Sequence, residues 1–117
     1  MNNENVTNLE QSLKLTELIG TDTADMVYTG GNKDYLRVRN KNTLIGVLDV
    51  LAWSFGALVD LVPVDQLGIW RMNALTMYDG FAFCTDSPAG GHYYKGKTKL
   101  EAVFNAVIDI YERRAKR

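Results

Sequence analysis

Residues 70–84 read WRMNALTMYDGFAFC, two apolar and aromatic runs that flank the dipeptide Asp79-Gly80. Asp-Gly accepts the positive backbone angles of the tight turns that join antiparallel strands. Side chains in the first run alternate between two faces, as they do along a strand. This is the clearest strand-pair signal in the chain, and it predicts a β-hairpin near the centre of an antiparallel sheet.

A helix is predicted after this hairpin, preceded by a short strand at Tyr93-Tyr94. Thr98 and Glu101 have the spacing of a capping box, and apolar residues recur at helical spacing from Leu100 to Tyr111. Basic residues close the segment, where they complement the partial negative charge of a helix C-terminus. The start, the apolar face and the end therefore all indicate one amphipathic helix.

The N-terminal third of the chain predicts a short helix followed by a hairpin. Thr7–Glu10 has capping-box spacing, and a moderate amphipathic pattern runs on to about Ile19, where Gly20 ends it. Met26–Thr29 and Tyr35–Arg39 flank a glycine-containing segment, and the second of these runs alternates as a half-buried strand does.

A second helix is predicted over residues 44–53, ended by Gly56 and followed by a strand at 58–64. Apolar residues recur there at helical spacing and leave only a thin polar face. Such a helix is expected to be covered on more than one side, inside the domain or at an oligomer contact. The candidate interface residues are Leu44, Val47, Leu51 and Trp53.

Together these segments predict a single α+β domain over residues 1–117, with residues 1–6 disordered. The sheet is expected to be mainly antiparallel, with about four to five strands and two or three packed helices. The chain has 117 residues and is 46% hydrophobic, which suits one core but is too short for two ordinary domains.

Charge and composition exclude several classes of protein. The formal net charge of -1 provides no overall field for nucleic acid, so nucleic acid is not an expected partner. Asp49 and Asp60 interrupt the longest apolar stretch, which argues against a membrane span. The N-terminus lacks the pattern of a secretory signal, so the protein is expected in the cytoplasm.

Residues 90–99 are the first candidate for a ligand site. Three lysines lie there at a predicted helix N-terminus, which attracts anions, and residues 91–98 match the phosphate-loop string G-x-x-x-x-G-K-[ST]. Only about 20 residues follow the string, too few for the remaining parallel strands of such an NTPase. The candidate ligand-binding residues are His92, Tyr93, Tyr94, Lys95, Lys97, Thr98 and Lys99, with Arg71 from the hairpin.

No catalytic or metal-binding constellation is evident. His92 is the only histidine and Cys84 the only cysteine, so neither a histidine pair nor a multi-cysteine zinc site can form. The aspartates are scattered without a D-x-D pair. We therefore predict no catalytic residues, no metal and no cofactor.

The second half of the chain carries the pattern of a known group of proteins. It shows a helix-like apolar segment at 43–53, a strand with Trp70-Arg71, the hairpin at 79–83, Gly90-Gly91-His92-Tyr93, and a helix opening at 98–103. In this it resembles the small phage-encoded proteins described as ABA-sandwich domains, over residues 42–117. The resemblance implies a phage or prophage accessory gene and supplies no enzymatic role.

The leading hypothesis is a non-enzymatic phage accessory protein that binds a host protein or sequesters a small anionic or nucleotide ligand. Two alternatives stay open. One is a nucleotide-using enzyme built on residues 91–98, and the other is a structural or assembly subunit that forms a homo-oligomer through residues 44–53.

Overall fold

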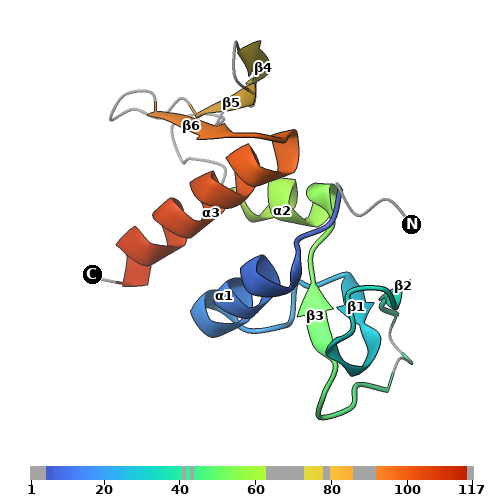
Figure 1. The fold of residues 1–117 in the computed structure, drawn as a ribbon. Coiled ribbons are helices and arrows are strands. Elements are labelled where there is room, and N and C mark those ends of the chain that lie inside the picture. The colour runs from blue at the N-terminus through green and yellow to red at the C-terminus, as the bar shows by residue number, and fades with distance from the viewer. Residues whose placement is uncertain are drawn as a thin grey trace. The chain divides into compact units, whose positions relative to one another are not determined.

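The computed structural model describes residues 5–40, 42, 44–62, 73–77, 80–85 and 92–115 (Figure 1). The chain divides into two compact units, Met1–Ala57 and Leu58–Arg117. We describe each unit by itself. The prediction of one domain over residues 1–117 stays a prediction.

Unit 1 is built on a three-stranded antiparallel sheet. The central strand β1 (Met26–Tyr28) pairs with β2 (Leu36–Val38) on one side and with β3 (Val50–Ala52) on the other. A short 3-10 turn, η1 (Thr29–Gly31), follows β1, and both of its glycines have a positive φ. The hairpin predicted at residues 26–39 is therefore confirmed.

Helix α1 (Leu9–Ile19) lies in unit 1 and contacts β3. Its capping box lies one residue later than predicted, because Asn8 is the N-cap and exchanges hydrogen bonds with Gln11. Gly20 ends the helix with φ 78°, a conformation that favours glycine, as the sequence predicted. Val6 forms a β-bridge with Ser54, whereas residues 1–4 of the segment predicted to be disordered lie outside the described residues.

Thr7 is part of a buried polar network rather than a helix cap. Its side chain is fully buried, and its Oγ1 lies 2.8 Å from Ser12 Oγ and accepts a 3.0 Å hydrogen bond from the backbone N–H of Trp53. The buried Tyr28 hydroxyl donates to the carbonyl oxygen of Thr7 at 2.7 Å, and burial raises the pKa of this phenol. These hydrogen bonds tie the segment before α1 to β1 and to the residue that follows β3, and they satisfy polar groups that would be costly to bury alone.

The structure corrects the prediction for residues 44–64. Residues 44–49 are not helical and residues 50–52 form β3. The helix α2 (Phe55–Leu61) begins one residue before Gly56, the residue predicted to end a helix. Gly56 lies inside α2, and the predicted strand at 58–64 is helical through Leu61; residues 63–64 lie outside the described residues. A short apolar run is compatible with either a helix or a strand, and pairing with β1 decides for the strand here.

Unit 2 contains a second antiparallel sheet and the C-terminal helix. β4 (Asn73–Met77), β5 (Gly80–Thr85) and β6 (His92–Gly96) pair in that order, and α3 (Lys99–Ala115) contacts β5 and β6. The predicted hairpin, the predicted strand at Tyr93-Tyr94 and the predicted last helix are all confirmed. The register pairs Met77 with Gly80, so Gly80 is a strand residue and the link between β4 and β5 is residues 78–79, outside the described part.

The α+β class predicted from the sequence is confirmed. The strands, however, form two sheets of three among the described residues rather than one sheet of four to five. The two sheets belong to different units of the chain.

Candidate functional site

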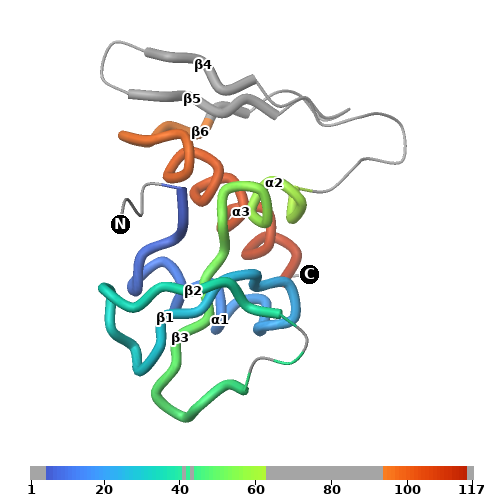
Figure 2. Tube along the Cα trace, turned by 90° about the vertical axis from the view of Figure 1, so that its right-hand side faces the viewer, coloured from blue at the N-terminus to red at the C-terminus, as the bar shows by residue number. Residues whose placement is uncertain are grey.

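Residues 44–48, here called the apolar loop, lead into β3 and include the three most exposed large apolar side chains of the described residues. The exposed fractions are 89% for Leu44, 40% for Ile45, 101% for Val47 and 75% for Leu48. In Figure 2 the loop is the green segment that projects beyond the strands of unit 1. Contiguous apolar exposure of this kind marks interaction sites more often than it marks ordinary surface.

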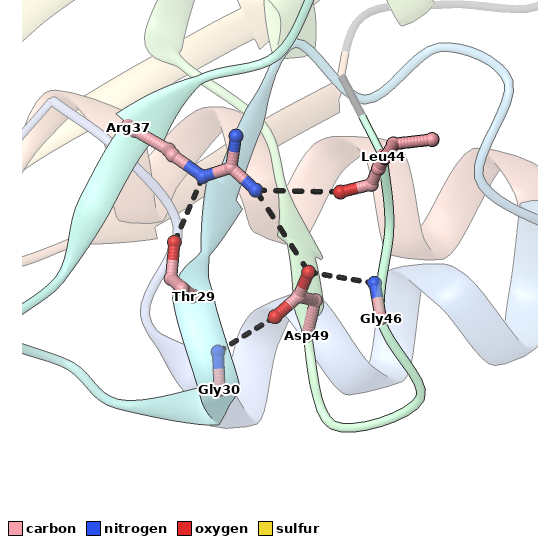
Figure 3. A network of polar contacts seen from close by, with 6 residues as sticks. All are labelled: Thr29, Gly30, Arg37, Leu44, Gly46 and Asp49. Atoms are coloured by element: carbon pink, nitrogen blue, oxygen red, sulfur yellow. Dashed lines mark hydrogen bonds and ion pairs between the residues drawn. The ribbon is translucent and has the colours of Figure 1, made fainter.

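The apolar loop is anchored at its C-terminal end by Asp49. One carboxylate oxygen accepts a 2.7 Å hydrogen bond from the backbone N–H of Gly30, and the other accepts a 2.8 Å bond from the backbone N–H of Gly46 (Figure 3). The Asp49 side chain is 10% exposed. A single carboxylate thus connects the loop to the turn that follows β1.

Arg37 of β2 supplies a second anchor. Its Nε donates to Thr29 Oγ1 at 2.8 Å, and its Nη2 donates to the carbonyl oxygen of Leu44 at 3.4 Å (Figure 3). The same Nη2 lies 3.9 Å from Asp49 Oδ2, an ion pair whose arginine side is 43% exposed. The first residue of the apolar loop is therefore held to β2 through its backbone, which leaves its side chain exposed.

The electrostatics of the anchor follow from these contacts. The hydrogen bonds from Gly30 and Gly46, with the charge of Arg37, lower the pKa of Asp49 below its usual 3.8, although desolvation opposes them. The carboxylate is consequently ionised at neutral pH.

The predicted interface residues separate into two groups. Leu44 and Val47 lie on the apolar loop and are exposed, whereas Leu51 is 7% exposed and Trp53 is fully buried in unit 1. Trp53 also donates its indole N–H to Thr23 Oγ1 at 2.9 Å. Ile45 and Leu48 were not among the predicted interface residues. A helical pattern selects residues on one face, whereas all four large apolar side chains of the apolar loop are exposed.

The predicted ligand segment has a different structure from the expected loop. His92–Gly96 is the strand β6, and its residues pair with β5 from Phe81↔Gly96 to Thr85↔His92. A phosphate loop needs backbone N–H groups aimed at the ligand, and these residues are extended in an antiparallel ladder instead. The nucleotide hypothesis stays a prediction that this backbone geometry does not favour.

The predicted ligand-binding residues differ in exposure and in the contacts that they make. Lys95, Lys97 and Lys99 are exposed, and Thr98 Oγ1 accepts from the backbone N–H of Glu101 at 3.0 Å, which confirms Thr98 as the cap of α3. Gly96 packs so closely on the start of α3 that a Cβ there would lie 2.5 Å from the backbone nitrogen of Ala102. Only the backbone of His92 and Tyr93 is described, and Arg71 lies outside the described residues.

The Tyr94 side chain makes a structural contact between β6 and α3. Its hydroxyl donates to Asp109 Oδ2 at 2.7 Å, and Arg113 Nε lies 3.1 Å from the other carboxylate oxygen. Burial, followed by the interaction with Asp109, raises the pKa of Tyr94 to about 12. The phenol therefore stays protonated and ties β6 to α3.

Within the described residues, no group of three or more His, Cys, Asp or Glu side chains is placed to hold a metal ion. In the same part of the chain, none of the helices has the length and apolarity needed to cross a membrane. No protein-family model, curated protein or solved structure matches the chain.

Proposed function

We propose that the protein is a non-enzymatic binding protein that docks on another protein through the apolar loop, residues 44–48. The observation that carries the proposal is the exposure of four large apolar side chains on one anchored loop. A host protein as the partner and a phage origin remain part of this proposal.

The energetics support docking through this loop. Burying an aliphatic side chain of this size stabilises a complex by about 1.5–3 kcal/mol. Binding also costs the entropy of ordering a flexible segment. The hydrogen bonds of Asp49 and Arg37 hold both ends of the apolar loop before a partner arrives, so less of that cost remains.

The test compares three immobilised proteins in quantitative pull-downs from a bacterial lysate: the parent, the double variant Leu44→Ser/Val47→Ser, and the control Leu13→Ser. Leu13 is also an exposed apolar residue, 57% exposed, but it lies on α1. We expect a partner that the parent and the control retain and that the double variant loses by at least about tenfold, since two buried aliphatic contacts are removed.

Two outcomes would contradict this function. One is that all three proteins retain the same partners, and the other is that the parent retains none. Light scattering of the parent addresses the assembly alternative. A dimer that dissociates in the double variant would assign the apolar loop to a second copy of the chain.

A further inference from the structure

The apolar loop reverses direction in a tight turn that has apolar residues at its centre. The backbone N–H of Asp49 donates to the carbonyl oxygen of Gly46 at 3.2 Å, which is the hydrogen bond of a four-residue β-turn. Val47 and Leu48 are therefore its two central residues. Such positions favour Gly, Pro, Asn, Asp and Ser, because their backbones or short polar side chains suit a turn. A choice against local propensity is expected where a residue serves a function.

Val47 lies at the tip of the turn and is not covered by its neighbours. Its side chain is fully exposed, those of Leu44 and Leu48 are mostly exposed, and that of Ile45 is the least exposed of the four. The loop projects beyond the strands of unit 1 (Figure 2). A projecting group of aliphatic side chains is buried most completely by a concave surface, since a flat surface contacts only the tip.

The backbone of the apolar loop is suited to an apolar environment. The N–H of Gly46 donates to Asp49 Oδ2, its carbonyl oxygen accepts from the N–H of Asp49, and the carbonyl oxygen of Leu44 accepts from Arg37 Nη2 (Figure 3). Burying a backbone polar group without a partner is costly. These three groups have partners within unit 1, so a partner protein can cover the loop without leaving them unsatisfied.

Two copies of the apolar loop are a poor match for each other. Complete burial of the four side chains on both copies would remove on the order of 500–1,000 Å² of apolar surface from water. A stable interface buries about 1,200–2,000 Å². Two projecting tips that face each other would also bury only part of their surface. The apolar loop alone therefore does not provide a homodimer interface.

A lipid surface is disfavoured by the charges at the apolar loop. The charged groups bonded to the loop are Arg37 and Asp49, which are of opposite sign and lie 3.9 Å apart. Apolar segments that bind membranes usually add an excess of Lys and Arg, which attracts anionic lipids. The net charge of the whole chain is -1. The shape and charge of the loop thus favour a pocket in a protein.

We propose that the apolar loop inserts into a concave apolar pocket of the partner protein, with Val47 deepest in that pocket. This inference rests on the proposed function and adds the shape and chemistry of the surface that the partner presents. The proposed function itself requires only that the partner contacts the loop.

The test uses the immobilised full chain and the same bacterial lysate, with two substitutions at the tip. Val47→Thr keeps the shape of the side chain and adds a hydroxyl group, which an apolar pocket would leave without a hydrogen-bond partner. Val47→Trp makes the side chain too large for a pocket that fits valine. We expect each variant to bind the retained partner at least about fivefold more weakly than the parent does.

The matched control is Leu13→Trp, which places the same bulk on an exposed position of α1 and should bind as the parent does. Since Val47 is fully exposed, both of its variants should also unfold in urea at the same midpoint as the parent. Weaker binding would then report the contact with the partner and not a loss of folded protein.

Several outcomes would overturn the inference. Equal or tighter binding by Val47→Trp would show an open surface, and equal binding by Val47→Thr would show that the tip is not buried in an apolar pocket. In either case, loss of the same partner by Leu44→Ser/Val47→Ser would leave the proposed function intact. Co-sedimentation of the parent with phosphatidylcholine–phosphatidylglycerol vesicles, or a dimer that the double variant dissociates, would assign the loop to another occupant. If the parent retains no partner, both proposals fail.

Discussion

At the scale of single residues, Asp49 does most to shape the candidate site. Its two carboxylate oxygens accept from Gly30 and Gly46, which are 16 residues apart in sequence, and Arg37 completes the cluster. Hydrogen bonds to an ionised acceptor are stronger than those to a neutral one. Ionisation of this carboxylate therefore holds the apolar loop against the rest of unit 1.

We predict that Asp49→Asn lowers the free energy of unfolding at about pH 7 and that its effect disappears in acid. The folded-state pKa of Asp49 lies below the usual 3.8, so the stabilisation is complete above that value and is lost as pH falls through the lower folded pKa. Urea unfolding of parent and variant between about pH 7 and pH 2 measures the difference.

The control for this measurement is Asp34→Asn. The side chain of Asp34 is exposed, and its carboxylate makes no hydrogen bond to any residue that the structure describes. The variant Asp34→Asn should have the same free energy of unfolding as the parent at each pH. A constant gap between Asp49→Asn and the parent over the whole pH range would contradict the anchor role of Asp49.

At the scale of elements, the end of β6 packs closely on the first turn of α3 in unit 2. A Cβ on Gly96 would lie 2.5 Å from the backbone nitrogen of Ala102 and 2.8 Å from Glu101. Backbone atoms cannot move aside to relieve such a clash as the flexible end of a side chain can. We predict that Gly96→Ala lowers the free energy of unfolding by about 1–3 kcal/mol, measured by denaturant unfolding.

Gly56→Ala is the matched substitution for Gly96→Ala. An added Cβ at Gly56 would lie 3.9 Å from Ser54 Oγ, an ordinary contact distance, and Gly56 lies in helix α2. Alanine favours a helix over glycine by up to about 1 kcal/mol, so this variant should be neutral or stabilised. If both variants lost the same stability, close packing of β6 on α3 would not be the cause.

The elements that the sequence predicted are those set by local interactions. Thr98 caps α3 through a residue three positions away, and Gly20 ends α1 with its own positive φ. The helix predicted at 44–53 fails because non-local contacts decide that region. Asp49 bonds to Gly30, 19 residues earlier, and Leu51 pairs with Val27 of β1. A window of neighbouring residues contains neither contact.

The candidate site was predicted only in part, for the same reason. The excess of apolar residues at 44–53 predicts a segment that is covered on more than one side, and two of its candidate interface residues, Leu44 and Val47, are exposed. Which members of the run are exposed depends on where β3 begins, and that follows from pairing with β1. The position of β2 at the edge of the sheet has no sequence signature, because the sheet order β2-β1-β3 is set by the whole of unit 1.

At the scale of the whole molecule, the low net charge allows the apolar loop to promote association between copies of the chain. The chain has a formal charge of -1 at neutral pH and a pI of about 5.7, so electrostatic repulsion between copies is weak. We predict that the solubility of the protein is lowest near the pI. The double variant Leu44→Ser/Val47→Ser should raise the solubility at that pH at least about twofold, because exposed apolar patches promote association. Precipitation with ammonium sulfate across this pH range measures the solubility. Leu13→Ser removes one isolated apolar side chain and should raise it less; an equal or larger rise would show that total apolar exposure, and not the apolar loop, controls association.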